Sequence, residues 1–388
     1  MLTLGVGIIL VVHLLALGWM LRSRRWFDWP ANRRPTLDAP IAMTAIVPAR
    51  NEAEDIEGCL RSLLQQDVET LRVIAVNDHS TDATPQIIDG LADEDSRLTP
   101  LHDPTVTPGW LGKHNALHTA LAQVETDLVV FTDADVTFAP ECLRMAVAEL
   151  EARQLDLLSL CPQIEYVTFC ETMLLPIYMV AEVLYVSPAI ENPRSARALA
   201  VGAFILVRTE KIRALGGYES IKDKILDDVN IARLFKRHGL PVGLRAAPDL
   251  MHVRLFKGNW HAFTGVTKHV LGIVQPRYWL APLFATLPLT IYGTLLWGLI
   301  AGLLTGRSVL AGMALVTLVL HYAGILLLRP RARFSALKAL AFPCAGVLFA
   351  VSCLHATYLL LVKRMFHWRG RATQVEDRPD DESRGVRH

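Results

Sequence analysis

Two aspartates separated by one residue, Asp133 and Asp135, stand directly after the apolar segment Leu128-Val129-Val130. Residues 128–132 are predicted to form a strand, and side chains at positions i and i+2 then project from the same side of its end. Two carboxylates so placed are ligands that a hard divalent cation prefers, together with the phosphates of a bound nucleotide. A turn that only closes the strand is the structural alternative.

Two more acidic sites favour the cation site over the simple turn. Asp78 follows the predicted strand 73–76, and Asp227-Asp228 precede the predicted helix 229–236. A carboxylate within hydrogen-bond reach of an attacking hydroxyl acts as a general base, which is the role considered for this pair. An acidic pair at a helix start also stabilises the helix through its macrodipole, and one residue can do both.

The segments that carry these residues alternate between short apolar stretches and amphipathic ones. Strands are predicted at residues 43–48, 73–76, 128–132, 155–160 and 204–207, and helices at 54–66, 82–91, 114–124 and 140–152. This alternation is typical of an α/β fold, in which a mostly parallel sheet carries helices on both faces. Ligands of such sheets bind beyond the carboxyl ends of the strands, where Asp78 and Asp133 fall.

Several other site types are disfavoured. The sequence contains neither a GxGxxG nor a P-loop motif, which argues against a dinucleotide-dependent dehydrogenase and a P-loop NTPase. His114 and His118 lie four residues apart on a predicted helix, and we interpret them as exposed helix residues because no acidic third ligand accompanies them. The net charge of +1 and the absence of a basic stripe with interleaved aromatic residues give no reason to expect nucleic acid as a partner.

Apolar runs at both ends of the chain predict membrane helices. Residues 2–21 are almost uniformly apolar and are followed by Arg22, Arg24 and Arg25. Positive charge after the run, rather than before it, indicates a retained anchor whose basic end faces the cytoplasm, not a cleaved signal. Three later runs are each long enough to span a bilayer, at about residues 281–304, 309–328 and 339–362.

The number of membrane crossings is three or four. If all four runs cross, the basic segment after residue 362 lies outside, against the positive-inside tendency. The run that contains Pro282 and Pro288 is the candidate for an interfacial or re-entrant segment. The chain is thus divided into an N-terminal transmembrane helix (1–21), a cytosolic α/β domain that ends in interfacial helices (22–280), a membrane region of two or three helices (281–362) and a charged, disordered tail (363–388).

Five motifs occur in a characteristic order, IVPARNE (46–52), VNDHSTD (76–82), GK (112–113), DAD (133–135) and LDD (226–228). In this order and spacing the chain resembles the inverting family 2 glycosyltransferases with the GT-A fold, over about residues 44–279. The segments PGWLGK (108–113), GGY (216–218) and QPRY (275–278) are similar to the hopene-associated branch of that family, whose members are bacterial membrane enzymes. The resemblance implies a Rossmann-like GT-A domain and a nucleotide-diphosphate sugar donor, with UDP expected.

The resemblance also implies roles for residues around the donor. Asp78 would accept a hydrogen bond from the uracil ring, and Pro48, Arg50 and Glu52 would line the same nucleotide pocket. Asn77 departs from the family pattern, which has Asp at this position, and this weakens the assignment of the donor.

A second set of residues would handle the diphosphate and the sugar. Asp135 would bind Mg2+ or Mn2+ directly, with Asp133 nearer the ribose and a metal-bound water. Lys113 and Arg254 would contact the phosphates, and Gly202 would let the backbone approach the donor sugar closely.

By the family pattern the second acid of the Asp227-Asp228 pair is the base, so Asp228 would deprotonate the acceptor. Asp227 stands where the family usually has Glu, and belongs to the substrate-binding set.

The membrane helices point to a lipid acceptor. Residues 169–185 are strongly apolar at helical spacing and are expected to form an interfacial helix, with a buried core helix as the alternative. We expect transfer of one sugar to a lipid hydroxyl by a multi-pass protein of the bacterial inner membrane with its catalytic domain in the cytoplasm. The first hypothesis for the acceptor is a hopanoid or another polyisoprenoid, with diacylglycerol, a carotenoid and polyprenyl phosphate as open alternatives. The alternatives are a processive polysaccharide synthase, disfavoured by the incomplete QxxRW motif at 275–279, and a non-catalytic membrane protein that binds a nucleotide sugar.

Overall fold

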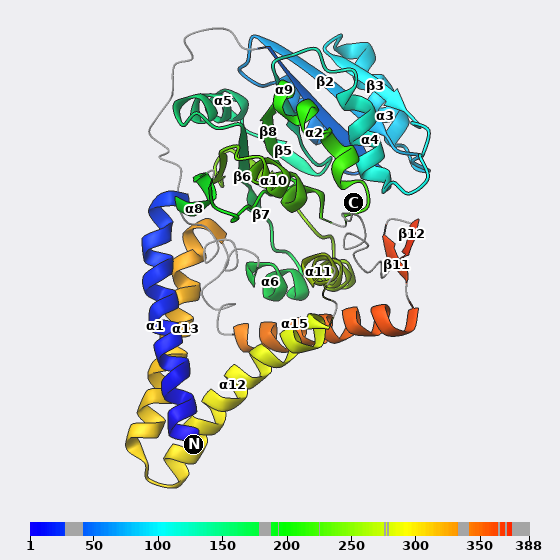
Figure 1. Ribbon diagram of the computed structural model, residues 1–388. Helices are drawn as coiled ribbons and strands as arrows, with labels where there is room; N and C mark the ends of the chain where they lie inside the picture. Colours follow the sequence, from blue (N-terminus) through cyan, green and yellow to red (C-terminus); the bar gives the residue numbers. More distant parts are fainter. Residues whose placement is uncertain are drawn as a thin grey trace, which may run out of the picture.

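The computed structural model describes residues 1–27, 42–177, 188–192, 194–224, 226–274, 277, 279–332, 341–363, 365–368 and 371–374. A globular α/β part stands above a set of long apolar helices, and the N-terminus lies at the far end of these helices (Figure 1).

The main sheet of the globular part is a seven-stranded mixed sheet. Its strands are β1 (Ala42–Ala49), β2 (Thr70–Asn77), β3 (Leu98–His102), β4 (Leu128–Phe131), β6 (Leu157–Cys161), β8 (Ile205–Arg208) and β9 (Val242–Ala246). They are arranged in the order β3-β2-β1-β4-β8-β6-β9, and only β8 runs antiparallel to its neighbours. The predicted α/β fold is confirmed. Because β2, β1 and β4 are adjacent and parallel, the acidic motifs that follow them meet at one edge.

Helices cover both faces of this sheet (Figure 1). One face carries α2 (Ile56–Leu64), α3 (Thr84–Glu94) and α5 (Cys142–Ala152), and the other carries α4 (Gly112–Leu121), α9 (Thr209–Ala214), η1 (Gly217–Ile221) and α10 (Asp227–Arg237). Strand β1 is buried from both sides. Met43 and Val47 belong to the hydrophobic core under α2, α3 and α5, and Ile46 belongs to the core under α4 and α10. A strand of this kind is an uninterrupted apolar run in the sequence, which is why its position was predicted to within one residue at each end.

A smaller sheet and two helices join the globular part to the apolar helices. The small sheet has the order β5 (Val136–Phe138), β10 (Met251–Val253) and β7 (Gln163–Ile164). Below it α6 (Phe169–Leu174) and α11 (Asn259–Val274) pack on each other and on α15 (Phe342–Tyr358) (Figure 1). The prediction of an interfacial helix at 169–185 is described only up to residue 177, because 178–187 lie outside the described residues.

Four helices are long and apolar enough to cross a membrane, among the residues that the structure describes. They are α1 (Leu2–Phe27), α12 (Leu280–Leu304), α13 (Ser308–Ala332) and α15. In Figure 1, α1 and α13 stand side by side, α12 runs obliquely to meet them, and α15 lies across. Helix α12 continues through Pro288, so the run with the two prolines is a single helix and α15 is the one that lies across the others.

The remaining elements are short. α8 (Pro188–Glu191) comes before β8 in the chain, and η2 (Leu359–Lys363) extends α15. Strand β11 (Met365–Trp368) pairs antiparallel with β12 (Arg371–Gln374) in the first part of the tail that was predicted to be disordered. Residues 375–388 of that tail lie outside the described residues.

A chain of hydrogen bonds links α1, α12 and α13 in their apolar surroundings. His13 Nδ1 lies 2.8 Å from the carbonyl oxygen of Ile9, His13 Nε2 lies 3.2 Å from His321 Nδ1, and Tyr292 Oη lies 2.7 Å from His321 Nε2. A carbonyl only accepts, so His13 carries its proton on Nδ1 and accepts at Nε2 from His321. His321 then accepts from Tyr292, so that each donor along this chain of side chains finds an acceptor.

We predict that His321→Leu destabilises this helix group. The substitution removes the bonds of His13 Nε2 and Tyr292 Oη to His321, and interhelical hydrogen bonds of this kind are worth about 1 kcal/mol. Thermal unfolding of the full chain in detergent is therefore expected to shift to lower temperature. Thr317→Val is the matched control, because the buried Thr317 hydroxyl donates only to Met313 of its own helix, at 2.7 Å. An equal shift in both variants would contradict the prediction.

Candidate active site

Polar side chains from three separate parts of the chain meet around Gly202 at the carboxyl edge of the main sheet. Lys113, in the first turn of α4, forms ion pairs with Asp133 at 2.6 Å and with Asp227 at 3.0 Å. The backbone N–H of Gly202 donates to Asp228 Oδ2 at 3.0 Å. A methyl group on Gly202 would lie 3.2 Å from Asp133 Oδ2 and 3.7 Å from Asp228 Oδ2, so only glycine leaves this space free. The structure thus brings five of the predicted residues together.

The acids of this cluster differ in their affinity for protons. Burial favours the protonated form, but Lys113 outweighs it and lowers the pKa of Asp227 to about 2. Burial and the adjacent Asp227 raise the pKa of Asp228 to about 7. Asp227 is therefore a permanent counter-ion of Lys113, whereas Asp228 can take up and release a proton near neutral pH. The latter property is what a general base requires.

Asp133 and Asp135 lie in a turn rather than at the end of a strand. Strand β4 ends at Phe131, and Val136 already belongs to β5, where it pairs with Val253 of the small sheet. The expectation that both carboxylates project from the same side of a strand end is therefore wrong. The chain passes from the main sheet to the small sheet between Phe131 and Val136. The two acids still interact, since burial and the charge of Asp133 raise the pKa of Asp135 to about 8.

The turn has the donor set of a cation site. Oδ1 of Asp135 is buried and has no hydrogen-bond partner among the described residues, an arrangement that a bound hard cation would satisfy. In the described ranges, no group of three or more His, Cys, Asp or Glu side chains is arranged to hold a metal. Asp133 and Asp135 therefore fit a divalent cation whose other ligands are water or the phosphates of a substrate.

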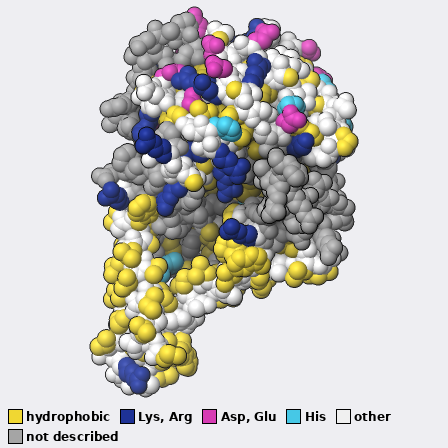
Figure 2. Space-filling model, in the orientation of Figure 1, with side chains coloured by type: hydrophobic (Ala, Val, Ile, Leu, Met, Phe, Trp, Pro, Cys, Tyr) yellow, Lys and Arg dark blue, Asp and Glu magenta, His cyan; other side chains and the backbone are white. Residues whose placement is uncertain are grey.

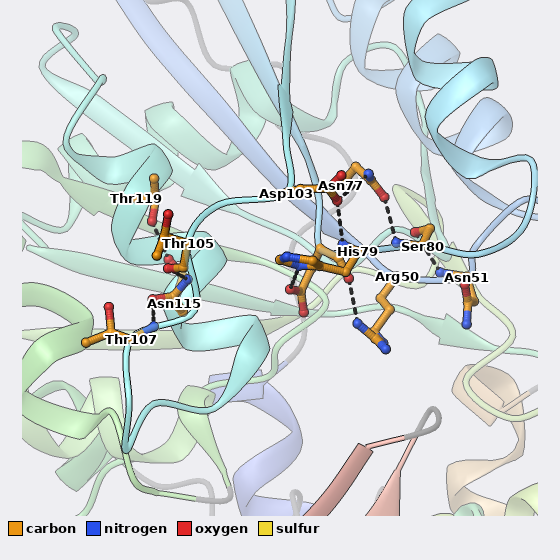
Figure 3. A network of polar contacts seen from close by, with 11 residues as sticks. Arg50, Asn51, Asn77, His79, Ser80, Asp103, Thr105, Thr107, Asn115 and Thr119 are labelled. Carbon is orange, nitrogen blue, oxygen red and sulfur yellow. Dashed lines mark hydrogen bonds and ion pairs between the residues drawn. The ribbon is translucent and has the colours of Figure 1, made fainter.

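The ends of β1, β2 and β3 are tied together by a polar network (Figure 3). Arg50 Nη1 donates to the carbonyl oxygen of Asp78 at 2.8 Å, next to the buried Asp78 side chain. Asn77 Nδ2 donates to Asp103 Oδ1 at 3.0 Å, and the backbone N–H of His79 donates to the same oxygen at 3.0 Å. An aspartate at position 77 would instead repel Asp103, which gives a structural reason for the departure from the family pattern.

Backbone strain is concentrated at this edge. Asn51, His79 and Asp103 have positive φ angles of 53°, 57° and 46°. They follow the three strands β1, β2 and β3, and the network holds each of them. Non-glycine residues persist in this region of φ only where the surroundings impose it, and such residues cluster at ligand sites. The observation supports a binding role for the loops that contain Arg50 and Asp78.

Three further predicted residues, Pro48, Glu52 and Arg254, lie in different surroundings. Pro48 lines the same small cavity as Lys113 and Asp133. Glu52 is buried, and its backbone N–H donates to the Thr84 hydroxyl at 2.9 Å. Arg254 lies 3.6 Å from the buried Glu171 of α6, so its described ion pair is with α6 and not with the Asp133–Asp228 cluster.

Comparison with protein families identifies the chain at the family level. A model described as Glycosyl transferase family 2 matches residues 44–172, and one described as Glycosyl transferase family group 2 matches residues 128–361, more than half of the chain. The chain is a member of the family 2 group of glycosyltransferases.

This glycosyltransferase has curated relatives in Staphylococcus aureus. It is 28% identical over 261 residues to the 4,4'-diaponeurosporenoate glycosyltransferase of strain USA300, which covers 62% of this chain and 65% of that protein, just under two thirds of its length. With the protein of the same name from strain MRSA252 it shares 26% identity over 371 residues, or 89% of this chain and 93% of that protein.

A solved structure matches nearly the whole glycosyltransferase. The mannosyltransferase PcManGT from Pyrobaculum calidifontis, in complex with GDP-Man and Mn2+, has a TM-score of 0.58 and 22% sequence identity. The match covers 94% of this chain and 100% of that chain. At this level of identity the likeness concerns the fold, and the predicted GT-A fold is confirmed.

Three residues of the glycosyltransferase site had no predicted role. His114, expected to be exposed, is 2% exposed because α4 packs this side against the sheet. Tyr218 lines the cavity, and although the GGY motif was noted, nothing in it indicated a site residue. Lys268 of α11 interacts electrostatically with Asp227, Asp133 and Asp228, and burial and Lys113 lower its pKa. No sequence signal marked Lys268, since α11 reaches the site only through tertiary packing.

Proposed function

We propose that this protein transfers one sugar from a nucleotide-diphosphate donor, most simply a UDP-sugar, to a lipid hydroxyl, with inversion at the anomeric carbon. The observation that carries the proposal is the meeting of the donor-side acid Asp133 and the base candidate Asp228 at Gly202, where Lys113 also lies. This arrangement puts the group that handles the diphosphate and the group that activates the acceptor in a single site.

On the donor side, the proposal gives Asp133 and Asp135 the role of binding a Mg2+ or Mn2+ ion. When bound, the cation would neutralise the charge that develops on the departing nucleoside diphosphate. Lys113 is the chain's own cation beside this position, and its two carboxylate partners raise its pKa well above the ordinary value even though burial opposes this. A lysine that stays protonated can move from Asp133 to the phosphates without losing its charge.

On the acceptor side, Asp228 removes the proton from the attacking hydroxyl. Its two carboxylate oxygens accept hydrogen bonds from the backbone N–H groups of Gly202, at 3.0 Å, and of Val229, at 2.7 Å. These contacts orient the carboxylate, while burial and Asp227 keep its affinity for a proton high. The proton ends on Asp228, the new bond forms between the acceptor oxygen and the anomeric carbon, and the bond from that carbon to the diphosphate breaks.

The apolar helices support a protein held at a membrane surface. On α15, Val347, Val351 and Leu354 are exposed and share one face, whereas Ala356 on the opposite face is buried. This exposed apolar stripe is suited to contact with lipid, and α15 lies crosswise to α1 and α13 (Figure 1). Figure 2 shows apolar side chains over the long helices and basic side chains between these and the globular part.

We therefore expect α1, α12 and α13 to cross the bilayer and α15 to lie flat along it. Three crossings keep the globular part, Arg22 and the basic segment after residue 362 on one side, which is the cytoplasmic side under the positive-inside rule. The conflict that four crossings created is then removed. We place the protein in the bacterial inner membrane on this basis.

The acceptor is proposed to be a membrane lipid, with a hopanoid or another polyisoprenoid as the first candidates. The hopene-like motifs in the sequence support the former, and relatives named for a diaponeurosporenoate acceptor support a lipid-like molecule in general.

Mass spectrometry of total lipids from cells with and without the gene tests this function. We expect one lipid that is heavier by one hexose or hexosamine only when the gene is present. A series of products with increasing numbers of sugars would contradict single transfer. Lipid profiles that do not differ would contradict a lipid acceptor.

A further inference from the structure

Two buried polar side chains, Tyr218 and His114, lie next to the cluster of Lys113, Asp133, Asp227 and Asp228 and have polar atoms without a hydrogen-bond partner among the described residues. The Tyr218 hydroxyl and both ring nitrogens of His114 are buried and have no hydrogen-bond partner among the described residues. The two rings touch edge to face, with centroids 6.0 Å apart. Burying a polar group without a partner is costly, and folded proteins retain such groups mainly where a ligand, a water molecule or a reaction needs them.

The Tyr218 hydroxyl is directed to the site by its surroundings. Gly216 and Gly217 have φ angles of 78° and 56°, which allow the tight turn that starts η1 and turns Tyr218 inward. Phe131 contacts its ring edge to face, with centroids 5.1 Å apart, and His114 contacts it from α4. The side chain is fully buried and lines the cavity with Lys113, Asp133, Gly202 and Asp227.

We propose that the Tyr218 hydroxyl forms a hydrogen bond with a hydroxyl group of the transferred sugar and so helps to select the donor. This inference rests on the function proposed above. The proposal gives the Tyr218 hydroxyl a partner on the transferred sugar, which is neutral and polar. In the proposed function this sugar lies between Asp133 on the diphosphate side and Asp228 on the acceptor side.

Chemistry favours a sugar hydroxyl over the other candidates. The phosphates are anionic and have Lys113 and the Asp133–Asp135 turn beside them, whereas the neutral phenol sits between aromatic rings. The Tyr218 hydroxyl is uncharged and can both donate and accept a hydrogen bond, and a sugar hydroxyl has the same two properties. The ring nitrogens of His114 stay neutral near physiological pH, since burial lowers the pKa of His114 to about 4. The ring that touches Tyr218 from α4 is therefore uncharged.

Lys113 lines the same cavity as Tyr218. It bridges Asp133 and Asp227 through its two ion pairs. A diphosphate that draws Lys113 away from these acids would open the space in front of the phenol. The hydroxyl then gains its hydrogen bond only when the sugar enters, which links donor binding to the completion of the site.

The test compares Tyr218→Phe with wild type in the full chain, in detergent or nanodiscs, using the donor and its monodeoxy analogues. We expect Tyr218→Phe to lower kcat/KM for the natural donor by about 10- to 100-fold. One monodeoxy donor should be poor for wild type and no poorer for the variant, which would identify the hydroxyl that Tyr218 contacts. The melting temperature of the donor-free variant should be unchanged or higher, because the deleted hydroxyl has no partner among the described residues.

Thr209→Val is the matched control. The Thr209 hydroxyl is also buried and without a partner among the described residues, but Thr209 follows Arg208, at the opposite end of β8 from Ile205, which lines the cavity. Its removal should leave kcat/KM and the preference among deoxy donors unchanged.

Several outcomes would overturn the proposal. Unchanged kcat/KM in Tyr218→Phe would do so, as would the same ranking of deoxy donors in variant and wild type. A fall in activity that only parallels a lower melting temperature would assign Tyr218 a packing role instead. The failure of the underlying function is distinguishable, because wild type itself would then transfer no sugar.

Discussion

Replacement of Asp228 by Asn is expected to lower turnover by about 10²- to 10⁴-fold while leaving nucleotide-sugar binding nearly intact. Asparagine has a similar shape but cannot take a proton from the acceptor hydroxyl. The donor-side residues Lys113, Asp133 and Asp135 are unchanged, so affinity for the donor should fall little. Steady-state transfer and calorimetric titration with UDP in the presence of Mn2+ measure the two quantities separately.

The structure also defines the controls for this experiment. Both Asp228 oxygens accept backbone hydrogen bonds, so Asn loses one of them and a modest decrease in melting temperature is expected. Asp67→Asn is the matched surface variant, since Asp67 is exposed and pairs with Arg144 at 2.9 Å, away from the catalytic cluster. Full activity in Asp228→Asn would exclude Asp228 as the base.

Replacement of Asp135 by Asn is expected to abolish cation-dependent binding of the donor. The carboxylate contributes a full negative charge and a buried oxygen that has no other partner among the described residues, and Asn provides only a weak neutral ligand. We expect a loss of at least about 100-fold in the affinity for UDP measured with Mn2+, and a similar loss in wild type after removal of divalent cations with a chelator.

Stability separates this role from a structural one. Burial and Asp133 disfavour the charged form of Asp135, so replacing this acid by the neutral Asn should leave the melting temperature of the donor-free protein the same or raise it. In wild type, added Mn2+ together with UDP should raise the melting temperature, and in the variant it should not. A variant that melts at lower temperature but binds UDP with unchanged dependence on Mn2+ would show that Asp135 only supports the turn.

Local sequence patterns accounted for much of the fold. Strand β4 was expected at 128–132 and is found at Leu128–Phe131, because a short buried strand is visible as an apolar run. The expected helix at 140–152 is found at Cys142–Ala152 for a similar reason, since its apolar positions repeat at helical spacing. Patterns of this kind depend on neighbours within a few residues, so strands and helices can be predicted from them without knowledge of the rest of the fold.

Predictions failed where distant segments decide the outcome. The turn at Asp133 and Asp135 was read as a strand end, but pairing of Val136 with Val253 moves the chain into a second sheet. His114 was read as an exposed helix residue, but Tyr218, about a hundred residues later, covers it. Helix α15 has the predicted composition of a membrane span, and only the tertiary structure shows how it packs against α12 and α11.

The sequence by itself determined that this is an α/β protein with apolar helices, whose acidic motifs follow adjacent parallel strands. Alternation of apolar segments and the positions of the motifs are enough for that conclusion, since parallel strands present their carboxyl ends together. Long-range packing was needed to show that Lys113 bridges Asp133 and Asp227, and that the buried Tyr218 hydroxyl in the same cavity has no hydrogen-bond partner among the described residues. Those contacts join residues far apart in the chain, and their geometry depends on how whole layers pack rather than on any local pattern.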